Sequence, residues 1–336
     1  MIEAMLSFSE KVLDIDAEAV SCAIAESVRQ TVFSRLRRRG AVVGLSGGID
    51  SSVTAALCAK ALGKDRVLGI MMPEDESSEE SLDLGRQLAD AIGIEYVTEH
   101  IGPTLKALGC YERRDNAIRK IIPEYGAGWK SKIVLPDLVK SSNYALYSVV
   151  AQSPTGETYR VRLNSESYLG VVAATNFKQR TRKMMEYFHA DRLWYAVAGT
   201  PNRLEYAQGF FVKNGDGAAD FKPIAHLYKS QVMQLGSYLG VPDAILRRSP
   251  TTDTYSMEQS QEEFYFALPL KTMDLCLYAR NHNVPSSSVA EGTGLSVEQV
   301  GRIYDMIDSK LNSTRYLHLG PQLVEKIEEV DASVHD

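Results

Sequence analysis

The sequence of 336 residues is poor in cysteine and contains no long run of apolar side chains. Its four cysteines, Cys22, Cys58, Cys110 and Cys276, lie far apart and form no CxxC pair. This pattern argues against a disulfide framework or a cysteine-ligated zinc ion, and it fits a reducing cytosol. No apolar run approaches the roughly 20 residues that a membrane-spanning helix needs, and the N-terminal segment does not read as a signal peptide. We therefore expect a cytoplasmic protein without a membrane-bound part.

An excess of positive charge is also missing. Lysine and arginine number 37 against 43 aspartates and glutamates, which gives a net charge of −6. A chain that repels polyanions overall is a poor candidate for non-specific nucleic-acid binding, so we expect no nucleic-acid partner. With 44% hydrophobic and 24% charged residues, the composition is that of an ordinary globular protein.

The N-terminal half alternates between helical and strand-like segments. The spacing of apolar residues predicts a helix over residues 17–39, with Gly40 as its C-cap, and a helix that follows residue 48 and ends at residue 62. Short apolar runs predict strands over 41–45, 67–72 and 94–97, with a helix over 77–92 and a later strand over 193–198. This alternation indicates an α/β fold with a doubly wound parallel sheet.

The alternation breaks between residues 110 and 170. Strand-forming residues at 144–151 and 158–163, joined by a turn with Pro154 and Gly156, predict an antiparallel hairpin in an inserted helix/β element. The chain after about Leu270 reads as helical, and Ser296 is a suitable N-cap. We expect one domain over residues 1–270, with the insertion at about 110–170, and a helical C-terminal extension over 271–336.

The segment Ser46-Gly47-Gly48-Ile49-Asp50-Ser51 lies between a predicted strand and a predicted helix. Glycines allow close approach of the backbone, and the free N–H groups of a helix start attract anions. A carboxylate beside phosphates makes sense if Mg²⁺ lies between them, because hard cations prefer oxygen ligands. The segment is neither a Walker A loop nor GxGxxG, which disfavours a hydride-transferring dinucleotide enzyme. We interpret it as a phosphate-binding loop rather than a turn without a ligand.

This segment resembles the SGGxDS loop of ATP pyrophosphatases, and further segments resemble the ammonia-dependent NAD synthetases within that superfamily. The resemblance covers about residues 15–265 apart from the insertion. The matching segments are Asn176 to Arg180, Gly199 to Glu205, Gly209 to Asp220, Leu227 to Val232 and Pro250 to Asp253. The resemblance implies an adenine nucleotide alpha hydrolase-like fold.

The resemblance also implies roles for individual residues. The residues expected to bind ATP are Gly44, Leu45, Ser46, Gly47, Gly48, Ile49, Asp50, Ser51, Ser52, Met72, Thr200, Lys229 and Thr251. Asp50 and Glu205 would hold Mg²⁺, and Arg180, Lys213 and Asp220 would bind the acid substrate. Asp50, Lys229 and Asp216 are the expected catalytic residues.

The implied reaction is ATP-dependent amidation of nicotinate adenine dinucleotide to NAD through an acyl adenylate, with release of AMP and pyrophosphate. We expect ammonia as the nitrogen donor, free or delivered by a separate glutaminase, because the chain has no room for an N-terminal amidase domain. The family also implies a homodimer.

Some positions depart from the family pattern. Pro201 removes a backbone donor near the phosphates, Val212 stands where a threonine is usual, and the C-terminal His-Lys-Arg segment has Arg315 as its nearest match. An AMP-forming amide ligase acting on a different carboxylic acid therefore stays open as an alternative. A nucleotide-binding protein without activity is disfavoured by the intact Asp50, Glu205 and Lys229.

Overall fold

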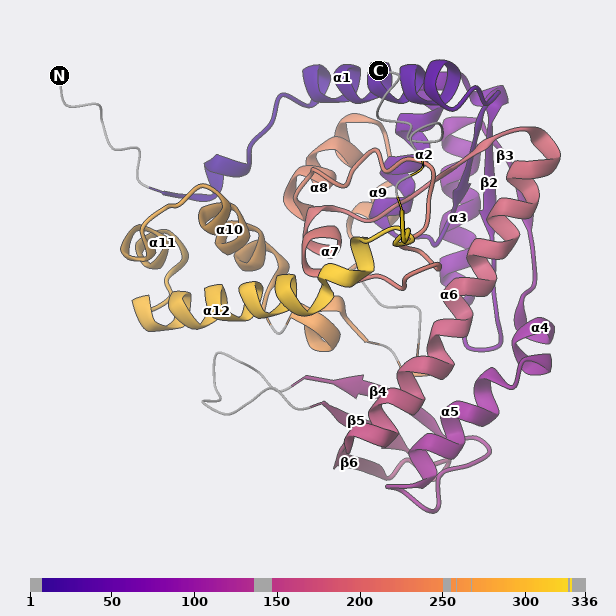
Figure 1. Ribbon diagram of the computed structural model, residues 1–336, viewed down its shortest axis with the longest axis vertical. Helices are drawn as coiled ribbons and strands as arrows, with labels where there is room; N and C mark the ends of the chain where they lie inside the picture. The colour runs from indigo at the N-terminus through magenta and orange to yellow at the C-terminus, as the bar shows by residue number, and fades with distance from the viewer. Residues whose placement is uncertain are drawn as a thin grey trace.

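A computed structural model describes residues 8–135, 147–249, 255–257, 259–266, 268–325 and 327. Its centre is a parallel sheet with the strand order β3-β2-β1-β7 (Figure 1). The strands are β1 (Ala41–Gly44), β2 (Val67–Met71), β3 (Glu95–Thr98) and β7 (Ala196–Ala198). Ala41 pairs with Val67 on one side and with Ala196 on the other. The sheet confirms the predicted doubly wound α/β fold.

Helices cover both faces of this sheet, because alternate residues of each strand point to opposite sides. Ala41 and Val43 pack in one core with α1 (Ala17–Arg29), α2 (Ile49–Leu62), α3 (Glu79–Ile92) and α8 (Lys229–Tyr238). Val42 faces the opposite core, with α4 (Gly102–Ala107) and α6 (Ser165–Leu193). The all-buried pattern of β2 is what burial on both faces requires.

Two predicted boundaries near the sheet are wrong. The first helix continues only as a π-helical turn, η2 (Gln30–Arg35), and the left-handed residue after it is Arg37 at φ 51°, not Gly40. Gly40 instead allows close packing, since a Cβ there would lie 2.3 Å from the Arg66 carbonyl oxygen. The predicted strand over 193–198 is shorter, because α6 includes Leu193 and Trp194 ends it in a left-handed conformation.

The insertion forms a separate antiparallel sheet with the order β4-β5-β6, beside helix α5 (Cys110–Arg119). Its strands are β4 (Lys130–Val134), β5 (Ser148–Gln152) and β6 (Thr158–Arg162). The pairing of β5 with β6 confirms the predicted hairpin, whose turn places Gly156 at φ 91°. The sequence pattern did not reveal β4. Predicted strand residues 144–146 lie outside the described residues.

The chain after β7 is mostly helical. After β7 follow α7 (Arg203–Gln208), α8, α9 (Asp243–Leu246) and the π-helical turn η4 (Glu262–Phe266). The C-terminal part contains α10 (Leu270–Asn281), α11 (Ser286–Thr293), α12 (Val297–Thr314) and η5 (Arg315–His318). Ser296 caps α12 in a capping box with Gln299, as expected. Short turns η1 (Glu10–Leu13) and η3 (Lys64–Arg66) complete the fold.

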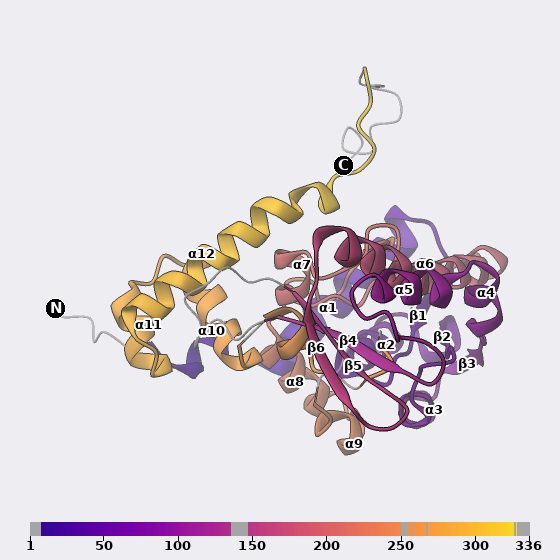
Figure 2. The ribbon, with the colours of Figure 1, turned by 90° about the horizontal axis from the view of Figure 1, so that it is seen from below.

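Helix α12 connects the C-terminal helices to the centre of the molecule. It begins beside α11 at the outer edge and its last turn lies near α7 (Figures 1 and 2). Its buried residues Val300, Ile303 and Ile307 share a core with α10 and with Leu204 of α7. The C-terminal helices are therefore packed onto the segment that follows β7. Among the described residues, no helix has both the length and the apolar character to cross a membrane.

Candidate active site

The loop between β1 and α2 is built to receive an anion. Gly48 is the N-cap of α2, and Gly47 has φ +73°. A Cβ at Gly47 would lie 2.5 Å from the Ser81 carbonyl oxygen, so only glycine fits this close approach to α3. The hydroxyls of Ser46 and Ser51 lie 3.1 Å apart beside the helix start. Free N–H groups of the first turn and these hydroxyls supply the donors that a phosphate requires.

This loop forms one wall of a cavity of about 700 Å³. Of the residues predicted to bind ATP, those that line the cavity are Gly44, Leu45, Ser46, Gly48, Ile49, Asp50, Ser51, Met72, Thr200 and Lys229. Gly47 and Ser52 do not line it, and the Ser52 hydroxyl donates to the Gly48 carbonyl at 2.8 Å. Thr251 lies outside the described residues. The cavity therefore brings together most of the predicted nucleotide contacts.

The Lys229 ammonium lies near the carboxylates of Asp50 and Glu205 at the edge of this loop. Lys229, at the start of α8, forms an ion pair with Asp50, and its backbone N–H donates to Asp274 of α10 at 3.1 Å. Asn202 donates from its side chain to Asp50 at 3.0 Å and from its backbone N–H to Glu205 at 3.1 Å. Asn202 thus holds both carboxylates and links the segment after β7 to the segment after β1.

Burial sets the electrostatics of this group. Burial and the neighbouring Asp50 charge raise the pKa of Glu205. For Lys229, burial acts against the charge, but the Asp50 and Glu205 carboxylates outweigh it and raise its pKa. One lysine facing two carboxylates leaves an excess of negative charge, which a cation would relieve. In the described part of the chain, no cluster of three His, Cys, Asp or Glu residues could hold a metal alone. The pair Asp50 and Glu205 fits Mg²⁺ whose other ligands are phosphate oxygens or water.

The predicted acid-binding residues are only partly brought together. Arg180 of α6 and Lys213 line the cavity, and the Arg180 Nε donates to the Lys213 carbonyl at 3.3 Å. Asp220 does not line it, because its carboxylate accepts from the Val197 N–H at 2.7 Å and from the Tyr187 hydroxyl at 3.2 Å. Asp220 as an acid-binding residue stays a prediction; in this structure its carboxylate holds the backbone of β7 through Val197.

Asp216 holds the loop that carries Lys213. Asp216 accepts from the Val212 N–H at 2.8 Å, and burial raises the pKa of its carboxyl group. The Lys213 ammonium donates to the carbonyls of Tyr316 and Leu319 at 2.8 and 2.7 Å. The segment after α12 therefore lies directly against the predicted acid-binding lysine.

Helix α12 and the turn η5 contribute cavity residues that no sequence motif indicated. They are Lys310, Ser313, Thr314, Tyr316 and Leu317, whereas Arg315 is not among the lining residues. The one local signal was Gly209, at φ +72°, where a Cβ would lie 2.3 Å from the Thr314 Cβ. A glycine at this place is required for α12 to approach α7, but only the structure shows what approaches.

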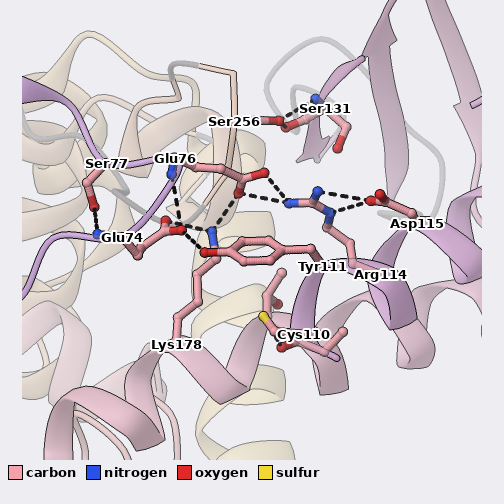
Figure 3. Close-up of polar contacts among 12 residues, drawn as sticks. Glu74, Glu76, Ser77, Cys110, Tyr111, Arg114, Asp115, Ser131, Lys178 and Ser256 are labelled. Atoms are coloured by element: carbon pink, nitrogen blue, oxygen red, sulfur yellow. Dashed lines mark hydrogen bonds and ion pairs between the residues drawn. The ribbon is translucent and has the colours of Figure 1, made fainter. Parts of the chain in front are cut away.

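A buried ion cluster holds the loop after β2, which also lines the cavity (Figure 3). Lys178 of α6, which is fully buried, contacts Glu74 at 2.9 Å and Glu76 at 2.6 Å. Glu76 also contacts Arg114 of α5 at 2.6 Å, and the Tyr111 hydroxyl donates to Glu74 at 2.5 Å. Pro73, Ser77 and Ser78 of the same loop line the cavity. The cluster thus attaches this cavity-lining loop to α6 and to the insertion.

The fold and site together define the class of the protein. A parallel sheet with a serine–glycine anion loop after its first strand, facing carboxylates from the segment after β7, is an adenine nucleotide alpha hydrolase-like arrangement. A family model described as NAD synthase matches residues 20–122 and 142–314. The chain belongs to the NAD synthase family.

Curated relatives agree with this membership. The chain is 56% identical over 326 residues to a protein of Rhizobium meliloti (strain 1021) called NH(3)-dependent NAD(+) synthetase, covering 97% of both chains. It is 34% identical to a protein of the same name from Thermotoga maritima, covering 80% of this chain and 88% of the relative.

Solved structures share the fold. An NMN synthetase from Francisella tularensis matches with a TM-score of 0.64 at 23% identity, covering 92% of this chain and 99% of that one. An NH3-dependent NAD synthetase from Campylobacter jejuni matches with a TM-score of 0.61 at 20% identity, covering 93% and 100%. At these identities the similarity concerns the fold alone.

Proposed function

We propose that this protein is an AMP-forming ligase that amidates nicotinate adenine dinucleotide to NAD with ATP and ammonia. The observation that carries the proposal is the 56% identity, over nearly the whole chain, to proteins called NH(3)-dependent NAD(+) synthetase. The Asp50–Lys229–Glu205 group beside the Ser46 loop supports it, because it supplies the charges that joining two anions requires. This degree of identity does not favour a different acid as substrate.

In the proposed first step, a carboxylate oxygen of the acid attacks the α-phosphorus of ATP and pyrophosphate leaves. The Ser46 to Ser51 loop would hold the phosphates through N–H groups and hydroxyls, and Thr200 lies on the same cavity. Lys229 would move from the Asp50 carboxylate to the phosphates, where it neutralises charge that builds up on the leaving group. Met71 and Met72, which also line the cavity, would flank the adenine.

Mg²⁺ would be held by Asp50 and Glu205. When bound there, it would neutralise phosphate charge and orient the leaving pyrophosphate. Asn202 holds both carboxylates, and Gln261 donates to Glu205 at 2.9 Å, so the pair is oriented before a ligand arrives.

In the second step, ammonia attacks the carbonyl carbon of the acyl adenylate, AMP leaves, and the nitrogen loses a proton. Arg180 and Lys213 would bind the acid, and Asp216 would act by fixing the Lys213 loop through Val212. Tyr316, whose carbonyl accepts from Lys213, and Leu317, which lines the cavity, would keep water from the adenylate. Ammonia would be free or delivered by a separate glutaminase.

We further propose a cytoplasmic homodimer. The four cysteines are all free, which suits a reducing compartment. The outer face of α6 exposes Leu169, Met184 and Phe188, each with more than half of its surface accessible. Arg180 is exposed on the same helix, so a second copy seated there would lie next to the proposed acid site.

The test is turnover by the pure protein with ATP, Mg²⁺, ammonium and the nicotinate dinucleotide, followed by separation of the nucleotides. We expect NAD and AMP in equal amounts. Lys229→Met should abolish both, and the surface variant Lys271→Met should retain both. Formation of ADP, or amidation only of another acid, would contradict the proposal.

A further inference from the structure

Part of the cavity wall is aromatic and is not used by the roles proposed above. The rings of Tyr147 and Tyr168, from the insertion and the start of α6, are stacked with centroids 4.7 Å apart. The rings of Phe210 and Tyr265 are stacked at 4.6 Å, and Phe264 also lines the cavity. Planar rings of this kind favour a planar ligand group such as a nucleotide base.

A lysine of the C-terminal helix lies against these rings. The Lys310 ammonium is 3.8 Å from the centroid of the Tyr265 ring and donates a hydrogen bond to the Tyr265 carbonyl. The Phe266 ring is 5.6 Å away. Lys310 is half-buried and lines the cavity, with Ser313 and Thr314 of the next helical turn.

No carboxylate of the described residues pairs with Lys310. Asp308, on α12 itself, pairs with Arg280 of α10. On the adjacent elements, Asp274 of α10 accepts from the N–H groups of Lys229 and Ser230, and Glu262 of η4 accepts from the Leu270 N–H. Glu205 of α7 accepts from Gln261 and Asn202. On the adjacent elements, η4 presents Tyr265, while η5 carries Arg315 and His318. Burial alone lowers the pKa of Lys310 to about 7. A cation is thus directed at the cavity without the anion that would stabilise its charge.

We propose that Lys310 is a binding residue for an anionic oxygen of the second substrate, beside the aromatic part of the cavity wall. The inference rests on the proposed function, in which that substrate carries both a pyrophosphate and a carboxylate. Binding an anion favours the charged amine, so the complex takes up a proton near neutral pH.

The experiment measures binding of nicotinate adenine dinucleotide without ATP, by calorimetry in buffers of different ionisation heat. Lys310→Met should bind about tenfold more weakly and lose the proton uptake, because a charge-assisted contact is removed. Affinity for ATP should stay as in the wild type. Lys60→Met is the matched control, since Lys60 also lies over a tyrosine ring, that of Tyr238, but outside the cavity.

Lys310→Arg provides a second readout that a loss of packing cannot mimic. Arginine stays charged, so this variant should keep its affinity but show no proton uptake, and its affinity should not fall as the pH rises above about 7. Repeating the titration with NAD, which lacks the carboxylate, identifies the anion. Equal Lys310 dependence for the acid and for NAD indicates the pyrophosphate, and dependence for the acid alone indicates the carboxylate.

Unchanged affinity and unchanged proton uptake in both Lys310 variants would overturn the inference. That result is distinct from failure of the proposed function, in which the wild-type protein itself does not convert the dinucleotide acid.

Discussion

At the scale of single residues, Glu205 lies where its own charge is disfavoured. Burial and the Asp50 carboxylate raise its pKa above the ordinary value of 4.5. A raised carboxyl pKa means that the folded protein keeps a proton which the unfolded chain has released. Stability from this group is therefore lost as the pH rises above about 4.5, with a slope of at most about 1.4 kcal/mol per pH unit.

We predict that Glu205→Gln removes this loss while it abolishes turnover. A glutamine still accepts from the Asn202 N–H, and its amide can donate to the Gln261 Oε1 atom, which has no hydrogen-bond partner among the described residues. Melting temperatures of the ligand-free proteins at about pH 5 and about pH 8 should differ less in the variant than in the wild type. Activity should fall at least about a hundredfold, because the variant lacks the carboxylate charge that we propose to hold Mg²⁺ beside the phosphates. An equal pH dependence of melting in both proteins would contradict the assignment.

Lys178 gives a prediction about stability. Replacing it with methionine leaves Glu74 and Glu76 with one cation fewer in a site where Glu74 is almost fully buried. Removing one partner of a buried ion pair typically destabilises a protein by about 3–5 kcal/mol. Urea unfolding of Lys178→Met should show a loss of this order, and Glu74→Gln in the same chain should restore part of it. Lys120→Met, which breaks the exposed pair with Glu166, is the control and should unfold like the wild type.

At the scale of elements, the approach of α12 to α7 depends on Gly209. Alanine at this position adds left-handed strain and a Cβ that would overlap Thr314. Gly240 is the matched control, because it has φ +74° but no atom of the described residues lies within 4 Å of a built Cβ. Gly240→Ala should therefore show the strain alone, about 1–2 kcal/mol. Gly209→Ala should lose more stability than Gly240→Ala. It should also raise the KM for the dinucleotide acid, since α12 carries residues that line the cavity.

A second test uses the double variant Gly209→Ala with Thr314→Ala, which removes the side chain that the new Cβ meets. Its stability should approach that of Gly240→Ala. If Gly209→Ala and Gly240→Ala unfold alike, the contact with Thr314 contributes nothing to the position of α12.

Elements were predictable from the sequence where neighbouring residues alone determine their conformation. The strand, glycine turn and helix around Ser46 to Ser52 follow from one apolar run and the residues after it. The strand β4 was not predictable, because its short run gains its meaning only from pairing with β5. Lys310 and Tyr316 were missed for the same reason. They reach the cavity through packing of α12 on a loop about a hundred residues earlier in the chain, which no local pattern encodes.

At the scale of the whole molecule, the exposed face of α6 is the feature that the single chain leaves unexplained. Leu169, Met184 and Phe188 are 62%, 56% and 55% accessible, although large apolar residues are usually covered. If the proposed homodimer forms over α6, the partner lies beside Arg180, and assembly and acid binding are linked.

We predict that Phe188→Glu in combination with Met184→Glu converts the protein to a monomer and raises the KM for the dinucleotide acid more than that for ATP. Two carboxylates in an apolar interface cost several kcal/mol on burial, whereas we propose that the ATP phosphates bind to the Ser46 loop of the same chain. Light scattering after gel filtration gives the mass, and initial rates give both KM values. Val297→Glu, at a residue that is 47% accessible on α12, is the control and should remain a dimer. The link between assembly and acid binding would be contradicted if the wild-type protein is monomeric at the assay concentration, or if the monomeric variant keeps both KM values. In either case the acid site would have to be completed within one chain.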